Sequence, residues 1–287
     1  MCETLEKLGL SIEQVHAESG SGQMEIALGH APALDAADGL LLAREAIMAC
    51  AARHELKASF LPKYRADQAG NGCHVHFSIW KDGRNLISLP TPHTPLSSID
   101  FQTLSLDPIM TSFLAGIYTH LPSLMCFTTP TPNSFRRLQP NCWAGAFQIW
   151  GYGNKESPIR IPIQTAVPGL FTNFEVKLND ATANPHVALA AIVASGLVGL
   201  DESMVLPSPT QIDPGMLNEA DREAKGIRRL PSDFASAKSH LMEVGSSLRA
   251  YLGEEVIQCL IAVRESEWTH MVQMPLEKEV KLLFDRY

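Results

Sequence analysis

Two glutamates flank a short glycine-rich turn near the start of the chain. Glu18 and Glu25 stand seven residues apart in the segment HAESGSGQME. If the segments on either side of the turn pair as adjacent strands, the two carboxylates converge, and they then repel one another unless a cation lies between them. The spacing therefore predicts a Mg²⁺ or Mn²⁺ site. Two exposed glutamates on a hairpin would give the same pattern and remain the alternative.

A second set of candidate ligands follows in the glycine-rich segment AGNGCHVHFS. His74, His76 and Ser78 alternate along a predicted strand and share one of its faces. Gly70 and Gly72 permit close approach of the backbone to a ligand. Histidines alone favour zinc or another transition metal, whereas one histidine joined to carboxylates also suits Mn²⁺ or Mg²⁺ in a phosphoryl-transfer site. Two histidines hydrogen-bonded at a strand surface remain the alternative here.

Basic side chains gather in two later segments, NSFRRL and NKESPIRIP. They are Arg136, Arg137, Lys155 and Arg160. Guanidinium groups bind carboxylates and phosphates through two parallel hydrogen bonds. The apolar neighbours of Arg160 argue against scattered surface charge, so these segments predict an anion-binding site.

Four helices are predicted to support these segments, because apolar residues recur there at helical spacing. They cover residues 36–54 with Asp35 as the cap, 108–120 after Asp107-Pro108, 185–200 after Asn184-Pro185, and the chain from Ser232 almost to its end, after Pro231. A proline in the first turn of a helix lacks only an N–H group that has no intrahelical partner there.

Short alternating or β-branched runs predict strands between the helices. They cover residues 23–28, 58–63, 74–80, 146–150, 159–163 and 174–178. The last run places Glu175 and Lys177 on one strand face. Because the runs are widely separated, we expect an α+β fold, with helices packed over an antiparallel sheet. Residues 84–106 and 202–231 are polar and proline-rich and are predicted to be loops.

Composition limits the class of protein. The chain has 287 residues, of which 45% are hydrophobic and 19% charged, so one globular unit spanning 1–287 is expected. A net charge of -8 and a pI near 5.7 argue against nucleic acid or an anionic membrane as partner. The six cysteines form no CxxC pair, and the longest apolar stretches, such as 187–200, are short for a bilayer. We expect a soluble cytoplasmic protein that binds small molecules.

Read in order, these segments resemble the glutamine synthetase family. The matching patterns are H-x-E...G-Q-x-E, F-x-P-K, G-x-H-x-H-x-S, N-S-[YF]-x-R-L-x-P, N-[RK]-x-x-x-I-R-I-P and E-x-[RK]...D...A-N-P. They cover residues 13–200 strongly and the helical C-terminal part weakly. The resemblance implies a curved antiparallel sheet flanked by helices. It also implies a ligase of nitrogen metabolism that joins glutamate to ammonia or a larger amine, with ATP as co-substrate and γ-glutamyl phosphate as intermediate.

The resemblance implies a role for each candidate metal ligand and for Gly70. Glu18 and Glu25 match ligands of one divalent cation, and His74 and Glu175 match ligands of a second, each cation being Mg²⁺ or Mn²⁺. Gly70 matches a backbone contact to the glutamate substrate. Phosphoryl transfer depends mainly on positioning and charge neutralisation, which agrees with such a set.

The remaining matches concern anions. Arg137 matches the arginine that clamps the carboxylate of the glutamate substrate. His76 and Ser78 fall on the nucleotide side, and Lys155 and Arg160 match a catalytic basic pair that stabilises phosphate. Lys177 also falls on the nucleotide side. Both Lys155 and Lys177 stand where synthetases usually have arginine, and lysine keeps the charge but loses the two-pronged geometry.

Two further departures bear on activity. The chain begins just before the Glu18 block, so the N-terminal β-grasp domain and the E-x-E strand of the family are expected to be absent. Each metal then lacks one carboxylate, and the ring oligomer of the family is not assumed. Trp143 stands where synthetases have a glutamate that binds ammonium, and an indole cannot accept a proton. Its flat wall suits a bulkier amine, as in the branch with γ-glutamyl-polyamine ligases and fungal developmental regulators.

Three hypotheses follow from these patterns. The chain is an ATP-dependent glutamate-amine ligase, a non-catalytic relative with a structural or regulatory role, or a fragment of a longer enzyme. The ligand and arginine pattern favours the first. The missing E-x-E strand and the lysine substitutions favour the second, and the missing strand is also what the third would explain.

Overall fold

A four-stranded sheet in the order β3-β9-β8-β7 positions most of the candidate residues. The computed structural model describes residues 1–87, 99–102, 104, 106–163 and 171–287. The strands of this sheet are β3 (Val75–Phe77), β9 (Phe174–Val176), β8 (Ile159–Ile161) and β7 (Trp150–Tyr152). The predicted antiparallel arrangement is observed for β3, β9 and β8, and β7 adds a parallel edge next to β8.

Three long helices form the core beside this sheet. Helix α3 (Pro108–Thr128) packs against both α5 (Pro185–Asp201) and α7 (Phe234–Glu243). Two glycines permit the contact of α3 with α5, since a Cβ atom on Gly116 would lie 2.1 Å from the carbonyl oxygen of Ser195, and one on Gly199 would lie 2.1 Å from that of Ser112. A larger residue at either position would force the helices apart.

The starts of these helices agree with the sequence analysis. The side chains of Asp107, Asn184 and Asp233 accept hydrogen bonds from backbone amides in the first turns of α3, α5 and α7, respectively. Helix α3 continues beyond the predicted end at residue 120, through Pro122 to Thr128, because its second half is apolar and buried. It is long and apolar enough to cross a membrane, which corrects the prediction that the longest apolar stretches are too short. However, 72% of that stretch is buried, as in a core helix.

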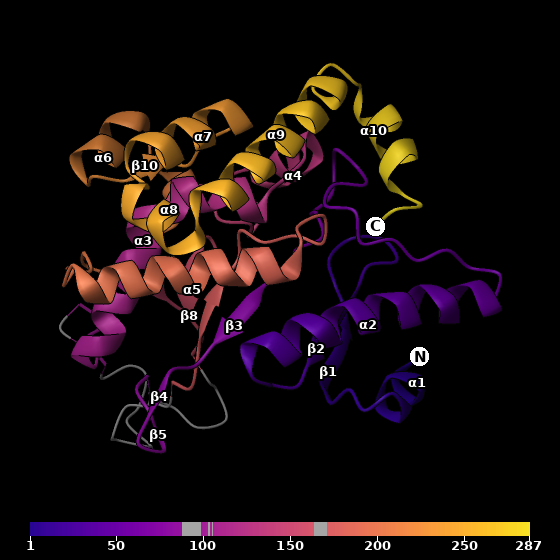
Figure 1. Cartoon of the computed structure of the whole chain (residues 1–287), viewed down its shortest axis with the longest axis horizontal. Coiled ribbons are helices and arrows are strands. Elements are labelled where there is room, and N and C mark those ends of the chain that lie inside the picture. The colour runs from indigo at the N-terminus through magenta and orange to yellow at the C-terminus, as the bar shows by residue number, and fades with distance from the viewer. Residues whose placement is uncertain (88–98, 103, 105, 164–170) are drawn as a thin grey trace.

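The N-terminal part lies to one side of this core, at the lower right of Figure 1 in indigo. It comprises α1 (Cys2–Lys7), the antiparallel strands β1 (Ile12–Ala17) and β2 (Met24–Leu28), and α2 (Ala33–Arg53). Pro32 precedes α2 as its N-cap residue. The prediction of Asp35 as the cap was therefore wrong, because the helix begins earlier and Asp35 lies in its first turn. An ion pair of 2.7 Å between Asp38 and His186 joins α2 to α5.

The C-terminal helical block predicted from Ser232 onward is confirmed, but it is divided. Beyond α7 it consists of α8 (Ser246–Leu252), α9 (Glu254–Met271) and α10 (Leu276–Leu283). A short helix, α4 (Pro132–Arg137), contacts α10 through the ion pair of Arg136 with Glu279. All six cysteines are free.

The segments predicted to be loops contain short elements. Residues 202–231 include a 3-10 turn, η2 (Pro214–Met216), helix α6 (Glu219–Ala224) and strand β10 (Arg228–Arg229), which pairs with β6 (Phe147–Gln148). Residues 84–106 include β5 (Arg84–Asn85), which pairs with β4 (Trp80–Lys81). Most of that second loop, 88–98 with 103 and 105, lies outside the described residues.

The strand predicted at residues 58–63 is not formed. Instead, the amide of Lys63 donates to Oδ1 of Asn133 at 2.7 Å, and the carbonyl of Leu61 accepts from Nδ2 of Asn71 at 2.8 Å. The amide of Phe60 donates to the carbonyl of Tyr287. Side chains and the distant C-terminal residue therefore take the hydrogen bonds that a neighbouring strand would have taken.

Candidate active site

The β1–β2 hairpin brings together the two predicted carboxylates and adds a histidine. His16 lies opposite Glu25 in the ladder, and Glu18 follows β1 directly. The imidazole of His16 is 3.6 Å from Oε1 of Glu18 through Nδ1 and 3.7 Å from Oε1 of Glu25 through Nε2. One donor atom from each of the three residues lies within 4.8 Å of the others, so the group has the size of a metal site.

The charges on this hairpin fit a divalent cation. Partial burial and the charge of Glu18 raise the pKa of Glu25, and His16 acts in the opposite direction. The two carboxylates thus repel each other, as predicted from their spacing. Two carboxylates and one imidazole form a donor set that suits Mg²⁺ or Mn²⁺.

The turn of the hairpin rests on the segment around Gly70. Nε2 of Gln23 donates to the carbonyl of Gly70 at 3.2 Å and to Oδ1 of Asn71 at 2.7 Å. A Cβ atom on Gly70 would lie 2.3 Å from the carbonyl oxygen of Pro62 and 2.7 Å from Cγ of Arg137. Only glycine fits at this position, because the chain itself fills the space around it. The predicted contact of Gly70 with the glutamate substrate stays a prediction.

The central sheet places the second set of ligands around one buried carboxylate. Glu175 on β9, with 3% of its side chain exposed, lies opposite His76 on β3 and Arg160 on β8. Its Oε1 atom is 2.8 Å from Nδ1 of His74 and 3.8 Å from Nε2 of His76. Its Oε2 atom forms an ion pair of 2.6 Å with Nε of Arg160. The two groups are not aligned for a hydrogen bond, and neither atom has another hydrogen-bond partner among the described residues. A buried carboxylate oxygen with unused lone pairs fits a metal ligand.

Opposing effects set the charges in this part of the site. Burial alone would raise the pKa of Glu175, but the hydrogen bond and charge of His74 and the charge of Arg160 lower it to about 2. Burial lowers the pKa of Lys177 to about 8, against the attraction of Glu175. Burial also lowers the pKa of His74, although its contact with Glu175 acts in the other direction. Glu175 is therefore anionic over the whole physiological range.

Arg137 is buried behind Gly70. Its Nη2 atom donates to the backbone carbonyls of Lys177, Leu178 and Asn179, the shortest of these bonds being 2.7 Å to Leu178. Its Nε atom is buried and has no hydrogen-bond partner among the described residues. The guanidinium thus braces the chain after β9. Its predicted role as a clamp for the substrate carboxylate stays a prediction.

The residues predicted on the nucleotide side lie on or directly after β3 (His76 and Ser78), in the connection before β8 (Lys155) and directly after β9 (Lys177). Nδ1 of His76 is 2.8 Å from Oδ1 of Asn173, and Oγ of Ser78 accepts a hydrogen bond of 3.0 Å from Nε1 of Trp80. Lys155 is exposed, and its carbonyl accepts a hydrogen bond from Nζ of Lys177. The two lysines are thus brought together.

Trp143 lies in a loop next to these lysines. Its backbone has φ of +54°, in a region that aromatic residues rarely adopt. The residue is 48% exposed, and its amide donates to Oε1 of the buried Glu156 at 2.9 Å. The Trp143 side chain is therefore about half exposed, and its predicted role as a wall for the amine stays a prediction.

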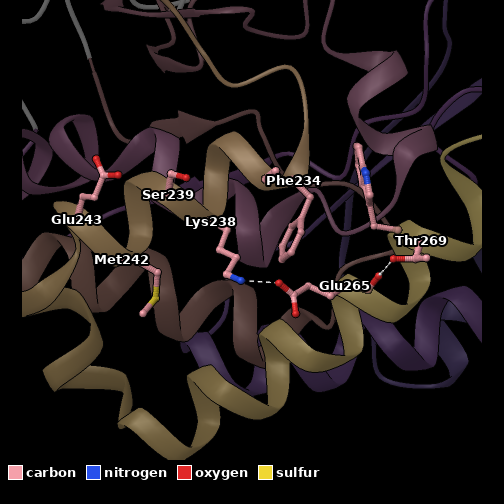
Figure 2. A pocket seen from close by; sticks show the side chains of 9 residues that line it. Phe234, Lys238, Ser239, Met242, Glu243, Glu265 and Thr269 are labelled. Atoms are coloured by element: carbon pink, nitrogen blue, oxygen red, sulfur yellow. Dashed lines mark hydrogen bonds and ion pairs between the residues drawn. The ribbon is translucent and has the colours of Figure 1, made fainter.

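A hollow of about 550 Å³ between α7 and α9 lies elsewhere (Figure 2). Of its three charged residues, Lys238, Glu243 and Glu265, the first and the last form an ion pair. Oγ1 of Thr269 donates to the carbonyl of Glu265 at 2.7 Å. None of the predicted site residues lines it. The charged residues around Glu175 are therefore the better candidate for chemistry.

The model of the glutamine synthetase catalytic domain matches residues 1–283. The chain belongs to this family.

Two relatives illustrate the range of the glutamine synthetase family. The gamma-glutamylpolyamine synthetase GlnA3 of Streptomyces coelicolor is 38% identical over 260 residues, which cover 90% of this chain and 53% of that protein. The glutamine synthetase of Methanocaldococcus jannaschii is 32% identical over 264 residues, which cover 92% of this chain and 55% of that protein. The chain spans about half the length of these relatives.

A solved structure shows the same fold. The complex of GmaS with ADP matches 99% of this chain and 62% of its own with a TM-score of 0.79 and 27% sequence identity. The α+β class predicted from the sequence is therefore confirmed, as is the resemblance to glutamine synthetases. ATP and a divalent metal ion are typical of this family.

Sequence reasoning did not select two residues of this glutamine synthetase domain. His16 was visible in the H-x-E spacing, because residues two apart share a strand face. Glu156 had no such signal, since its contact with Trp143 depends on how two loops pack.

Proposed function

We propose that the chain is the catalytic part of an ATP-dependent glutamate-amine ligase. The reaction converts glutamate, an amine and ATP into a γ-glutamyl amide, ADP and phosphate through γ-glutamyl phosphate. One observation carries the proposal, namely the buried Glu175 held between His74 and Arg160, whose Oε2 atom has no hydrogen-bond partner among the described residues. The charge of Glu175 also acts weakly on Glu25, which supports assigning the sheet and the hairpin to one site.

The metal ligands follow from this arrangement. Glu18, Glu25 and His16 would hold one divalent cation, and His74 and Glu175 would hold the other. Carboxylate oxygens with a minority of imidazole favour Mg²⁺ or Mn²⁺ over zinc. Such cations, when bound, neutralise charge on the phosphates of ATP.

The side chains around the cations divide the remaining work. Arg160, Lys155 and Lys177 place positive charge where the transferred phosphoryl group needs it. The backbone of Gly70, which packs against Arg137, would contact the glutamate substrate. His76 on β3 and Ser78 directly after it would lie on the nucleotide side.

The acceptor is proposed to be an organic amine larger than ammonia. Trp143 offers an exposed aromatic face and no proton acceptor. The similarity to a gamma-glutamylpolyamine synthetase supports the same choice. Ammonium is expected to be a poor substrate.

Release of ADP tests the proposal directly. The chain is incubated with ATP, Mg²⁺, glutamate and either ammonium or 1,4-diaminobutane, and ADP is measured with glutamate omitted as control. We expect glutamate-dependent ADP release that is greater with the diamine. ADP at background with every amine would overturn the proposal for this chain.

A non-catalytic binding module is the second candidate. It is favoured by Arg137 and Lys177, whose donor groups bond to backbone carbonyls of the chain itself. Calorimetry with ADP and Mg²⁺, combined with the ADP-release assay, distinguishes the two candidates. A binding module takes up nucleotide but shows no glutamate-dependent release of ADP.

A further inference from the structure

Glu156 is a buried acid whose surroundings only partly compensate its charge. It is 6% exposed and lies directly after Lys155, in the connection that leads to β8. Backbone amides of Trp143 and Asn141 donate to its carboxylate, the first at 2.9 Å to Oε1. A carboxylate has about four acceptor positions, so two amides leave room for further donors.

The cation that acts on Glu156 is shared with a second acid. Lys177 interacts with Glu156 and with Glu175 at the same time, and Nζ of Lys177 donates to the carbonyl of Lys155. Asp213 adds a further negative charge near Glu156. Burial is the main cause that raises the pKa of Glu156, and the charge of Asp213 raises it further. The hydrogen bonds from the two amides and the charge of Lys177 lower it. A second cation beside Glu156 would therefore be stabilised.

The face of Trp143 provides the other half of such a site. The ring is half exposed although the carboxylate that holds its amide is buried. Asn141 and Trp143 of this loop have φ of +61° and +54°, a conformation that costs backbone strain in a residue other than glycine, and the amides of both donate to Glu156. An indole face attracts alkylammonium groups through its ring electrons, most strongly where water is partly excluded.

We infer that Glu156 and Trp143 together bind an organic ammonium group, with the charge on Glu156 and the carbon chain against the indole. This inference rests on the proposed function, because the ammonium group is that of the acceptor amine. Glu156 is then a specificity-determining residue that favours cationic amines. Its link to Lys177 and Glu175 places the amine next to the phosphoryl-transfer residues.

Glu156→Gln separates this role from that of a simple loop brace. Glutamine keeps an oxygen that accepts from the amide of Trp143 but removes the negative charge. Binding of 1,4-diaminobutane is measured by calorimetry at fixed ionic strength, together with ADP and Mg²⁺ binding. We expect about ten-fold weaker diamine binding in the variant, because one partly desolvated charge contact is lost. ADP binding should be unchanged. Glu219→Gln on the exposed face of α6 is the charge-matched control.

Trp143→Leu provides a second, independent measurement. It keeps an apolar side chain and removes the ring electrons, so diamine binding should weaken while the fold, checked by circular dichroism, is retained. Equal diamine affinity in wild type and Glu156→Gln, or no diamine binding by the wild type, overturns the inference. Because these are binding experiments, diamine binding without any ADP release would contradict the proposed function and leave this inference standing.

Discussion

The imidazole of His16 lies directly opposite Glu25 in the β1–β2 ladder, with Nε2 of the histidine 3.7 Å from Oε1 of the glutamate. Oε1 of Glu18 lies 3.6 Å from the other nitrogen of the same ring, Nδ1. The hairpin therefore offers three donors of two kinds, where its glutamates alone would offer two of one kind.

His16→Gln is expected to weaken Mn²⁺ binding about ten-fold, as is typical for the loss of one histidine contact at a metal site. Electron paramagnetic resonance of free Mn²⁺ measures the affinity without any turnover. His30→Gln is the control, because His30 is also beside a glutamate, Glu13, but is 98% exposed. Equal losses in the two variants would show that His16 is not a ligand.

Gly70→Ala is expected to destabilise the fold by about 1–3 kcal/mol, because the new methyl group meets the carbonyl oxygen of Pro62 and that backbone cannot move freely. Urea unfolding measures the change. Gly39→Ala, inside α2, is the matched control and should be neutral or stabilising by about 0.5–1 kcal/mol, since its methyl group meets only the end of Leu10. A stable Gly70→Ala variant would contradict the close packing around Gly70.

Arg136→Ala should cost more stability than Glu279→Gln. Glu279 is 1% exposed in its side chain and Arg136 is 40% exposed, so loss of the arginine leaves a buried charge, whereas a freed arginine can reach water. The arginine variant should lose about 3–5 kcal/mol in urea unfolding. Arg65→Ala, which breaks the surface pair with Asp67, should lose less than about 1 kcal/mol. The reverse order of Arg136→Ala and Glu279→Gln would contradict this account.

Cys126 should resist alkylation in the native chain. Burial raises the pKa of its thiol to about 12, so very little thiolate is present at pH 8. Cys259 is exposed and should react first with iodoacetamide, as followed by mass spectrometry of peptides. Urea should bring the two rates together. Rapid labelling of Cys126 before unfolding would show that the core around α3 opens.

Local signals predicted the helices well. Asp107-Pro108, Asn184-Pro185 and Asp233 each place a capping oxygen next to the residues that it caps, so no distant contact is needed. The failed strand at 58–63 had the right composition. Its partners, including Asn133 and Tyr287, come from distant parts of the chain, and a single run of residues carries no information about them.

The candidate site was predictable in part. The family patterns selected Glu175 and His74, which the pairing of β3 with β9 brings together. The carbonyl contacts of Arg137 were not predictable, because they depend on the path of the backbone after β9. Glu156 was missed for a similar reason, since its partner is a backbone amide and any residue provides one.

Neighbouring residues of the short helix α4 connect two distant regions. Arg136 binds Glu279 of α10, and Arg137 packs against Gly70 and the carbonyls after β9. A ligand that orders the segment around Gly70 should therefore also reduce local opening of α10. Hydrogen exchange of the α10 amides should then slow when such a ligand binds. The exchange rate would thus report occupancy of the site near Gly70, although α10 does not line that site.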